Sequence, residues 1–223
     1  LRETRSYTWG LVIPDLTNFG FASIARALEA HCREAGIQLL IACSEDDPTL
    51  EQKVVDNLIS RQVDGIVWAI PESGSPCPWL TVDFLRQITV PVVFMNAAPR
   101  PDLAVVGYDN YAGAMLAMRH LIAQGRRHIA HISGPLEIWI AAERQRAWQE
   151  ALRAAGLPHG ANQLVEGDWQ PATGQKAIAT LFERFPEMDA VFVAGDYMCL
   201  GVLLEAQRRG KRIPEDLAVL GFG

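Results

Sequence analysis

The chain has 223 residues, of which 49% are hydrophobic and 21% charged, and its formal net charge is −6 at pH 7. This length is enough for one large domain or two small lobes. No apolar run reaches the roughly 18–20 residues of a membrane-spanning helix. The negative net charge argues that the chain itself does not bind nucleic acid, because neutralising phosphates needs clustered Lys and Arg. We therefore expect a globular domain with no membrane partner.

Cysteine usage indicates the redox environment. Cys32, Cys43, Cys77 and Cys199 lie far apart in the sequence, and none forms a C-x-x-C pair. Cys32 and Cys43 also fall on predicted core faces. This pattern favours buried free thiols in a reducing compartment and predicts a cytoplasmic protein.

Short apolar runs alternate with amphipathic segments along the chain. The first pair is a strand over 8–13 and a helix over 19–35, whose apolar residues fall on one stripe. The further strands expected are 37–43, 65–69, 90–94, 103–107, 128–132, 163–166, 190–194 and 217–221. The further helices expected are 48–61, 79–87, 110–124, 141–155, 172–184 and 197–209.

This alternation is typical of βαβ units and predicts parallel sheets. Asp47 and Asp109 mark helix starts, and Gly36 and Gly125 mark helix ends. Seven such units exceed one mononucleotide-binding unit, so we expect an α/β fold with a doubly wound parallel sheet divided between two lobes.

Polar and aromatic residues follow several predicted strands directly. In doubly wound sheets, ligands bind outside the carboxyl ends of the strands. Aromatic faces with a few hydrogen-bonding groups are the usual lining of a site for a small polar ligand. The stretches at these positions are Asp15–Phe21, Trp68, Asn96, Ser133–Pro135, Gly167–Trp169 and Gly195–Asp196.

No catalytic constellation is visible. His128 and His131 lie three apart on one predicted strand, so they face opposite sides and cannot share a metal. The chain also has no phosphate-loop, dinucleotide or nucleophile-elbow motif. We therefore expect a protein that is not an enzyme and that needs neither a metal nor a cofactor.

Six stretches together resemble the effector domain of the LacI/GalR family of bacterial transcription regulators. They stand in the family's order and span nearly the whole chain. They are "GLVIPDLTNFGFASIARALE", "RQVDGIVW", "VGYDNYAGAMLAMRHLIAQGRRHIAHISGP", "ERQRAW", "EGDWQPATG" and "VFVAGDYMCLGVLLEAQRRGKRIPEDLAVLGF". A seventh stretch, "QLLIACSEDDPTLEQ", most resembles the fructose repressor (catabolite repressor–activator) branch.

The resemblance implies a fold like that of periplasmic binding proteins. Two lobes, expected at residues 1–124 and 125–223, would each contain a doubly wound parallel sheet flanked by helices. A sugar, sugar acid or sugar phosphate would bind between them and shift DNA affinity by favouring one lobe geometry. The resemblance further implies a helix-turn-helix region before residue 1 that binds operator DNA, a return segment after residue 223, and a homodimer face that includes helix 48–61.

Arg144 and Trp169 match the ligand-binding arginine and stacking ring of the family. A guanidinium fork suits hydroxyls, carboxylates or phosphates, and an indole suits the apolar face of a sugar ring. The structural alternatives are a solvated arginine on a helix face and a core tryptophan.

The remaining candidate ligand contacts stand at strand ends, and most have a structural alternative. Asp15 and Asp196 also suit the starts of the following helices. Phe21 also suits the core, and Trp139, expected on the loop before helix 141–155, also suits packing between lobes. The other candidates are Asn18, Trp68 and Asn96.

The sequence departs from the family pattern at three sites, one of which is a pair of residues. Met95-Asn96 stands where the family often has Asp-Arg, an arginine that would suit a phosphate. Ala112 and Gly195 replace an aspartate and an amide that contact sugars in the family. These departures weigh against a sugar phosphate as the ligand. A neutral sugar or a sugar acid is expected at least as strongly. The alternative function is an extracytoplasmic sugar-binding protein of a transport system, which would share the fold.

Overall fold

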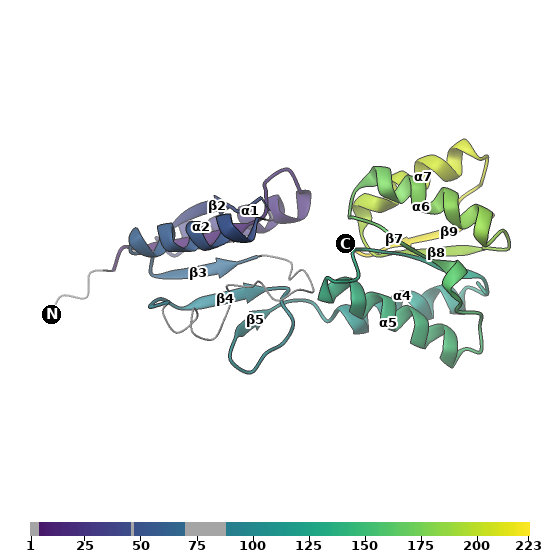
Figure 1. Cartoon of the computed structure of the whole chain (residues 1–223), viewed down its shortest axis with the longest axis horizontal. Helices are drawn as coiled ribbons and strands as arrows, with labels where there is room; N and C mark the ends of the chain where they lie inside the picture. The colour runs from purple at the N-terminus through teal and green to yellow at the C-terminus, as the bar shows by residue number, and fades with distance from the viewer. Residues whose placement is uncertain (1–4, 46, 70–87) are drawn as a thin grey trace. The chain divides into compact units, whose positions relative to one another are not determined.

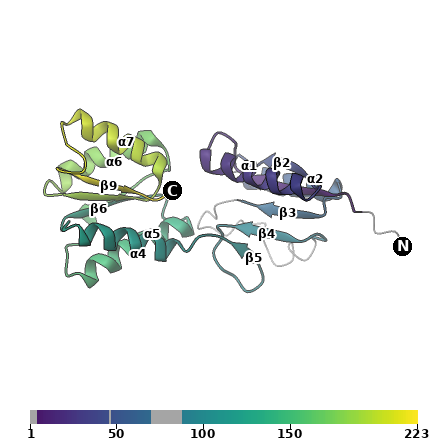
Figure 2. The same cartoon turned by 180° about the vertical axis from the view of Figure 1, so that it is seen from behind.

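The computed structural model describes residues 5–45, 47–69 and 88–223, and the chain divides into two compact units, Leu1–Gly107 and Tyr108–Gly223. Each unit is a parallel sheet with helices packed on it (Figures 1 and 2). This confirms the expected α/β class with two parallel sheets.

The first unit contains a five-stranded sheet in the order β2-β1-β3-β4-β5, with every neighbouring pair parallel. Its strands are β1 (Thr8–Ile13), β2 (Gln38–Cys43), β3 (Gly65–Trp68), β4 (Val92–Met95) and β5 (Ala104–Val106). Its described helices are α1 (Phe19–Glu34) and α2 (Pro48–Ser60). The order reverses at β1 and β3, which makes their carboxyl ends the topological switch point of this sheet.

Alternating side chains of β1 build a core on each face of the first sheet. Val12 packs in one cluster with Val55 and Leu58 of α2. Leu11 and Ile13 point to the other face and form a cluster with Ala25 of α1. Residues Gly10–Ile13 of β1 are all buried, so the strand is covered on both sides, as a central parallel strand requires.

The second unit repeats this winding in the order β7-β6-β8-β9, again parallel throughout. Its strands are β6 (Ile129–Ser133), β7 (Leu164–Glu166), β8 (Ala190–Val193) and β9 (Ala218–Gly221). Its helices are α4 (Asn110–Ala123), α5 (Trp139–Ala154), the short η1 (Ala161–Gln163), α6 (Pro171–Arg184) and α7 (Asp196–Arg208). Its switch point lies at the carboxyl ends of β6 and β8.

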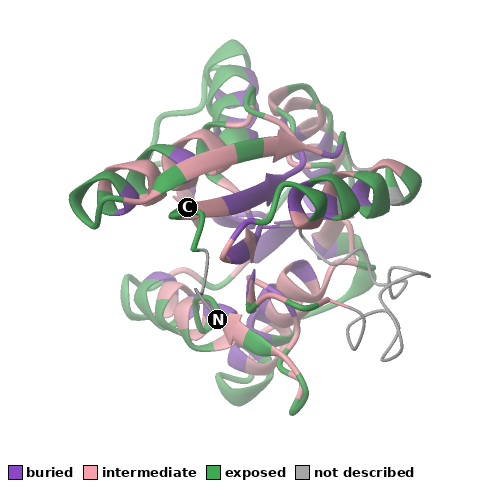
Figure 3. Cartoon of the chain, turned by 90° about the vertical axis from the view of Figure 1, so that its left-hand side faces the viewer, coloured by how far each residue is buried: buried purple, intermediate pink, exposed green. Residues whose placement is uncertain are grey.

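Two helix pairs cover the second sheet. Ile178 of α6 and Val202 of α7 share one core with alternate strand residues. Met118 of α4 and Trp148 of α5 share the core on the opposite face. Figure 3 shows buried residues on inner strands and exposed ones on the outer helix surfaces, in line with the fully buried β6 and β8.

Helix α4 groups with the second unit, because Met118 and Leu121 lie in one core with Trp148 of α5. The lobe boundary expected between residues 124 and 125 stays a prediction. The expected helix over 79–87 and Cys77 lie outside the described residues. The other cysteines are free, as expected.

Candidate functional site

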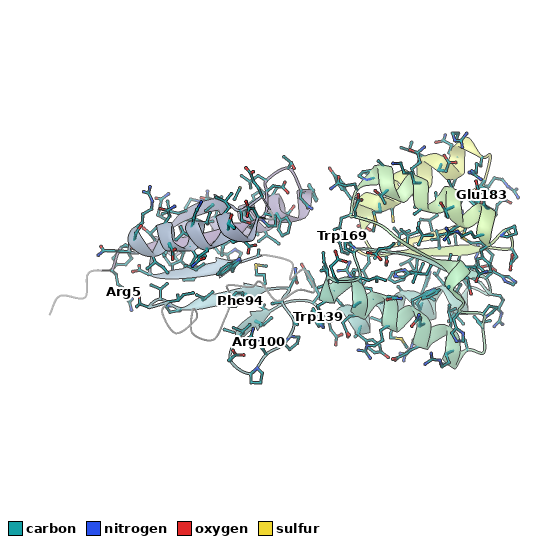
Figure 4. The ribbon with its side chains drawn as sticks, viewed as in Figure 1. Arg5, Phe94, Arg100, Trp139, Trp169 and Glu183 are labelled. Carbon is teal, nitrogen blue, oxygen red and sulfur yellow. The ribbon has the colours of Figure 1, made fainter. Side chains whose placement is uncertain are left out.

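The switch point of the second sheet is covered by an indole ring. Trp169 lies over Gly134, which follows β6, and beside Gly195, which follows β8; a β-carbon at residue 134 would overlap the ring, and one at residue 195 would stand 3.1 Å from Cε3. Figure 4 places Trp169 and Trp139 at the same end of this unit. The ring therefore bridges the ends of both central strands.

The backbone of Trp169 is in an uncommon conformation. Its φ is 69°, in the left-handed region that non-glycine residues seldom adopt. The preceding Asp168 accepts a hydrogen bond from the backbone N–H of Gln170 at 2.9 Å, which stabilises the turn. Because Trp169 is only half-buried, part of its ring remains open to solvent in this unit.

Arg144 of α5 lies beside this ring and is 8% exposed. Its Nε and Nη2 both donate to Oδ1 of Asn110, at 2.9 and 2.7 Å, and its Nη1 donates to the carbonyl of Ala194. The guanidinium carbon lies 3.9 Å from the ring centre of Phe222 and 5.9 Å from that of Trp169. The guanidinium is thus fixed by neutral acceptors and aromatic faces.

The charge of Arg144 is poorly compensated. Burial lowers the pKa of Arg144 to about 10, and the negative charge of Asp196 opposes this shift. A guanidinium has five N–H donors, and the described partners take three of them. One N–H on each terminal nitrogen is left for another acceptor, within the part of the chain that the structure describes.

Asp196 is exposed and begins α7, as the sequence predicted. Its carboxylate lies against Gly221 and Gly223, where a β-carbon would overlap its oxygens. The N-cap residue is Gly195, and the helix start has no side-chain cap. The carboxylate is therefore an exposed acceptor near Arg144.

Trp139 is the first residue of α5, two positions before the expected helix start. The N-cap, Ile138, makes no side-chain hydrogen bond, so the sequence carries no polar capping signal there. The indole is half-buried at the end of the unit that also carries Trp169 (Figure 4).

In the first unit, Asp15 and Asn18 organise the loop after β1. Asp15 Oδ1 accepts from the N–H and hydroxyl of Thr17, at 2.6 and 2.5 Å, and from the N–H of Asn18 at 2.8 Å. The Thr17 hydroxyl is the main cause that lowers the pKa of Asp15. Asn18 Oδ1 in turn accepts from the N–H of Gly20 and caps α1. Asn18 is thus the cap of α1, whereas Asp15, for which a capping role was the alternative, orders the loop before the helix.

Two aromatic candidates of the first unit pack inward. Trp68 is 2% exposed, and its ring stacks on Phe94 at 5.4 Å between centroids. Trp68 therefore packs in the core of the first sheet, and its contact with a ligand stays a prediction. Phe21 is half-buried and packs against the core under α1.

Asn96 combines a strained backbone with an unused acceptor. Its φ is 58°, and its N–H donates to Val106 O at 2.9 Å. Its Oδ1 is buried beside Gly107 and has no hydrogen-bond partner among the described residues. Asn96 thus offers a buried acceptor, Oδ1, that no described residue uses.

Sequence reasoning missed Asn110 and Phe222. Asn110 follows the α4 cap, and Phe222 follows an apolar strand, so neither pattern signals a role toward Arg144. Among the described residues, no group of His, Cys, Asp and Glu side chains could hold a metal ion, and no helix is long and apolar enough to cross a membrane.

Residues 9–223 match the family described as "Periplasmic binding protein domain". The chain is 31% identical over 218 residues to the ribose operon repressor of Halalkalibacterium halodurans, covering 96% of this chain and 61% of the relative. It is 32% identical over 224 residues to catabolite control protein A of Priestia megaterium, covering 100% of this chain and 66% of the relative. The chain thus spans about three fifths to two thirds of these curated relatives.

A solved structure described as "transcriptional regulator CelR-cellobiose complex" superposes with a TM-score of 0.84 at 30% identity. The likeness covers 97% of this chain and 67% of that one.

Proposed function

Because the chain belongs to the periplasmic binding protein domain family, we propose that it is the effector-binding part of a LacI/GalR-type transcriptional regulator. The relatives support this: one is named an operon repressor, another a control protein, and the similar solved structure is a regulator with cellobiose. These names favour a regulator over an extracytoplasmic sugar-binding protein of the same fold. They also favour binding without catalysis.

The observation that carries the proposal is the buried guanidinium of Arg144, which keeps unused donors beside an indole face. Two free N–H groups suit an oxygen pair, such as vicinal hydroxyls or a carboxylate. Trp169 offers a flat apolar surface for one face of a sugar ring. Asp196 supplies an acceptor for further hydroxyls.

The effector we propose is a neutral sugar or a sugar acid. Among the described residues, no carboxylate forms a hydrogen bond with the buried Arg144 cation. The cation therefore gains from a ligand that brings negative charge or electron-rich oxygen. Sugar phosphates are the third type of ligand to test, after neutral sugars and sugar acids. Effector contact by the other candidates stays a prediction; they are Asp15, Asn18, Phe21, Trp68, Asn96 and Trp139.

The full regulator is proposed to act in the cytoplasm as a homodimer that binds operator DNA through a helix-turn-helix region. The second copy would pack on the apolar surface of α7, where Tyr197, Leu200 and Leu204 are 47%, 51% and 61% exposed. Their spacing places them on one helix face. The expected face on α2 has no exposed large hydrophobic residue among its described side chains.

The test is a thermal-shift titration of the full chain with cellobiose, ribose, gluconate and fructose 6-phosphate. A ligand that binds only the folded state raises the melting temperature by mass action. We expect a rise with a sugar or gluconate that Arg144→Ala abolishes. Arg153→Ala, which removes an exposed arginine from the same helix, is the matched control and should keep the rise.

A rise that persists in Arg144→Ala would contradict the site. No rise with any of the four compounds would contradict the ligand class.

A further inference from the structure

We propose that Asn110 is the positioning residue of the effector arginine, and this inference rests on the proposed role of Arg144. Asn110 is 1% exposed and lies 34 residues before Arg144 in the chain. Its Oδ1 accepts from both Nε and Nη2 of Arg144, the two donors along one side of the guanidinium. A single acceptor shared by these two donors fixes the plane of the group as well as its place.

The chemistry of the contact requires an amide. Asn110 Nδ2 donates to the carbonyl of Tyr108 at 3.1 Å while Oδ1 faces Arg144. Arginine has no acceptor and a carbonyl has no donor, so only one orientation of the amide serves both neighbours. A carboxylate would serve Arg144 but would repel the carbonyl of Tyr108, and a shorter hydroxyl would lack the second partner.

The neutrality of Asn110 matters for what the arginine can bind. A carboxylate at this position would pair with the guanidinium and cancel its charge. With an amide, the guanidinium keeps its positive charge and its remaining donors for an outside group. Asn110 therefore sets both the geometry of Arg144 and its preference for anionic or oxygen-rich ligands.

The position of Asn110 is itself fixed by the start of α4. Asp109 accepts from the N–H of Ala112 at 2.8 Å and caps the helix, which makes Asn110 its first residue. The contact thus ties the guanidinium of Arg144 to the first residue of α4.

The first arm of the test needs no ligand. Hydrogen exchange at Nε–H of isotope-labelled arginine is followed by NMR in the full chain, with the Arg144 signal assigned from Arg144→Lys. We expect slow exchange in the wild type and an increase of about tenfold or more in Asn110→Ala, because the buried acceptor is lost. Gln163→Ala is the matched control, since Gln163 is another buried amide of this unit that bonds to Pro158 O and Gly160 N.

The second arm measures affinity for gluconate and cellobiose by calorimetry. Asn110→Ala should weaken whichever compound the wild type binds by about 10- to 100-fold, the range for a lost hydrogen bond to a charged group. Asn110→Asp, which keeps the size of the side chain, should retain slow Nε–H exchange and lose affinity for gluconate more than for cellobiose. Gln163→Ala should leave both affinities unchanged.

Unchanged Nε–H exchange in Asn110→Ala would overturn the inference whether or not a ligand binds. If Asn110→Ala does not fold, equal losses for gluconate and cellobiose in Asn110→Asp, or faster Nε–H exchange in it, would overturn it. Binding that survives Arg144→Ala would refute the proposed function instead. Loss of binding in Arg144→Ala together with wild-type affinity in Asn110→Ala would refute only the positioning role.

Discussion

The indole of Trp169 rests so closely on the backbone of Gly134 that residue 134 has no room for a β-carbon. The same ring also lies beside Gly195, at the end of the neighbouring strand. Because the backbone φ of Trp169 is positive, at 69°, the ring is presented by a turn that the surrounding structure must hold. The proposed stacking surface therefore depends on the absence of side chains beneath it.

Gly134→Ala should displace the Trp169 ring and weaken sugar binding. The added methyl overlaps the ring, and overpacking of this kind typically lowers the free energy of unfolding by about 1–3 kcal/mol. The displacement is measured by fluorine NMR of protein labelled with fluorotryptophan, and affinity by calorimetry. Gly65→Ala is the control, since its β-carbon would stand at an ordinary 3.5 Å from Pro91 O. An unmoved Trp169 signal with wild-type affinity would refute the stacking role.

Substitutions of Asp15 separate its loop role from ligand contact. Asp15→Ala removes the acceptor of three hydrogen bonds and should lower the free energy of unfolding by about 1 kcal/mol, as for a lost helix cap. Asp15→Asn keeps that acceptor and should keep stability, while the loss of charge weakens sugar binding. Urea unfolding and calorimetry give the two quantities. Unchanged affinity in Asp15→Asn would leave Asp15 with the loop role alone.

Charges on the exposed face of α7 should dissociate the proposed homodimer. The double variant Leu200→Lys with Leu204→Lys places two cations on a stripe that is otherwise apolar, and like charges would meet across a two-fold axis. Analytical ultracentrifugation should show a shift to monomer. Leu116→Lys, on α4 and 66% exposed, is the control. A double variant that sediments as the wild-type dimer would exclude α7 from the interface.

Local patterns in the sequence were enough to predict the described elements. Each expected strand has its counterpart within two residues, because apolar runs alternate with amphipathic segments. The predicted helix starts at Asp47 and Asp109 are confirmed by their capping hydrogen bonds. The unit boundary could not be found this way, since it depends on which core α4 joins.

The site was less predictable than the fold. Resemblance pointed to Arg144 and Trp169, but the partners of the guanidinium come from distant positions: Asn110 lies 34 residues away and Ala194 lies 50 residues away. The helix period of about 3.6 residues and the strand period of about 2 relate only near neighbours in the sequence, so neither period links Asn110 or Ala194 to Arg144. Trp68 shows the converse limit, because a tryptophan at a strand end can equally be core, as it is here.

A buried histidine in the second unit links stability to pH. His131 is fully buried between the rings of Trp148 and Phe192, at 5.6 and 4.9 Å between centroids. Burial is the main cause that lowers the pKa of His131 to about 4, and the charge of Arg144 acts in the same direction. The hydrogen bond from Nδ1 to Phe192 O opposes the shift.

The fold should therefore lose stability between pH 6.5, the ordinary pKa of histidine, and pH 4, the lowered one. In this window the unfolded chain binds a proton at His131 that the folded chain excludes, so the free energy of unfolding falls by up to about 1.4 kcal/mol per pH unit as pH decreases. Above pH 6.5, His131 is neutral in both the folded and the unfolded chain, so its burial no longer lowers the free energy of unfolding.

Urea unfolding at several pH values measures how steeply the free energy of unfolding depends on pH. His131→Phe should flatten this dependence, whereas His159→Phe, at an exposed position, should not. Equal slopes in the wild type and His131→Phe would mean that other groups carry the acid sensitivity.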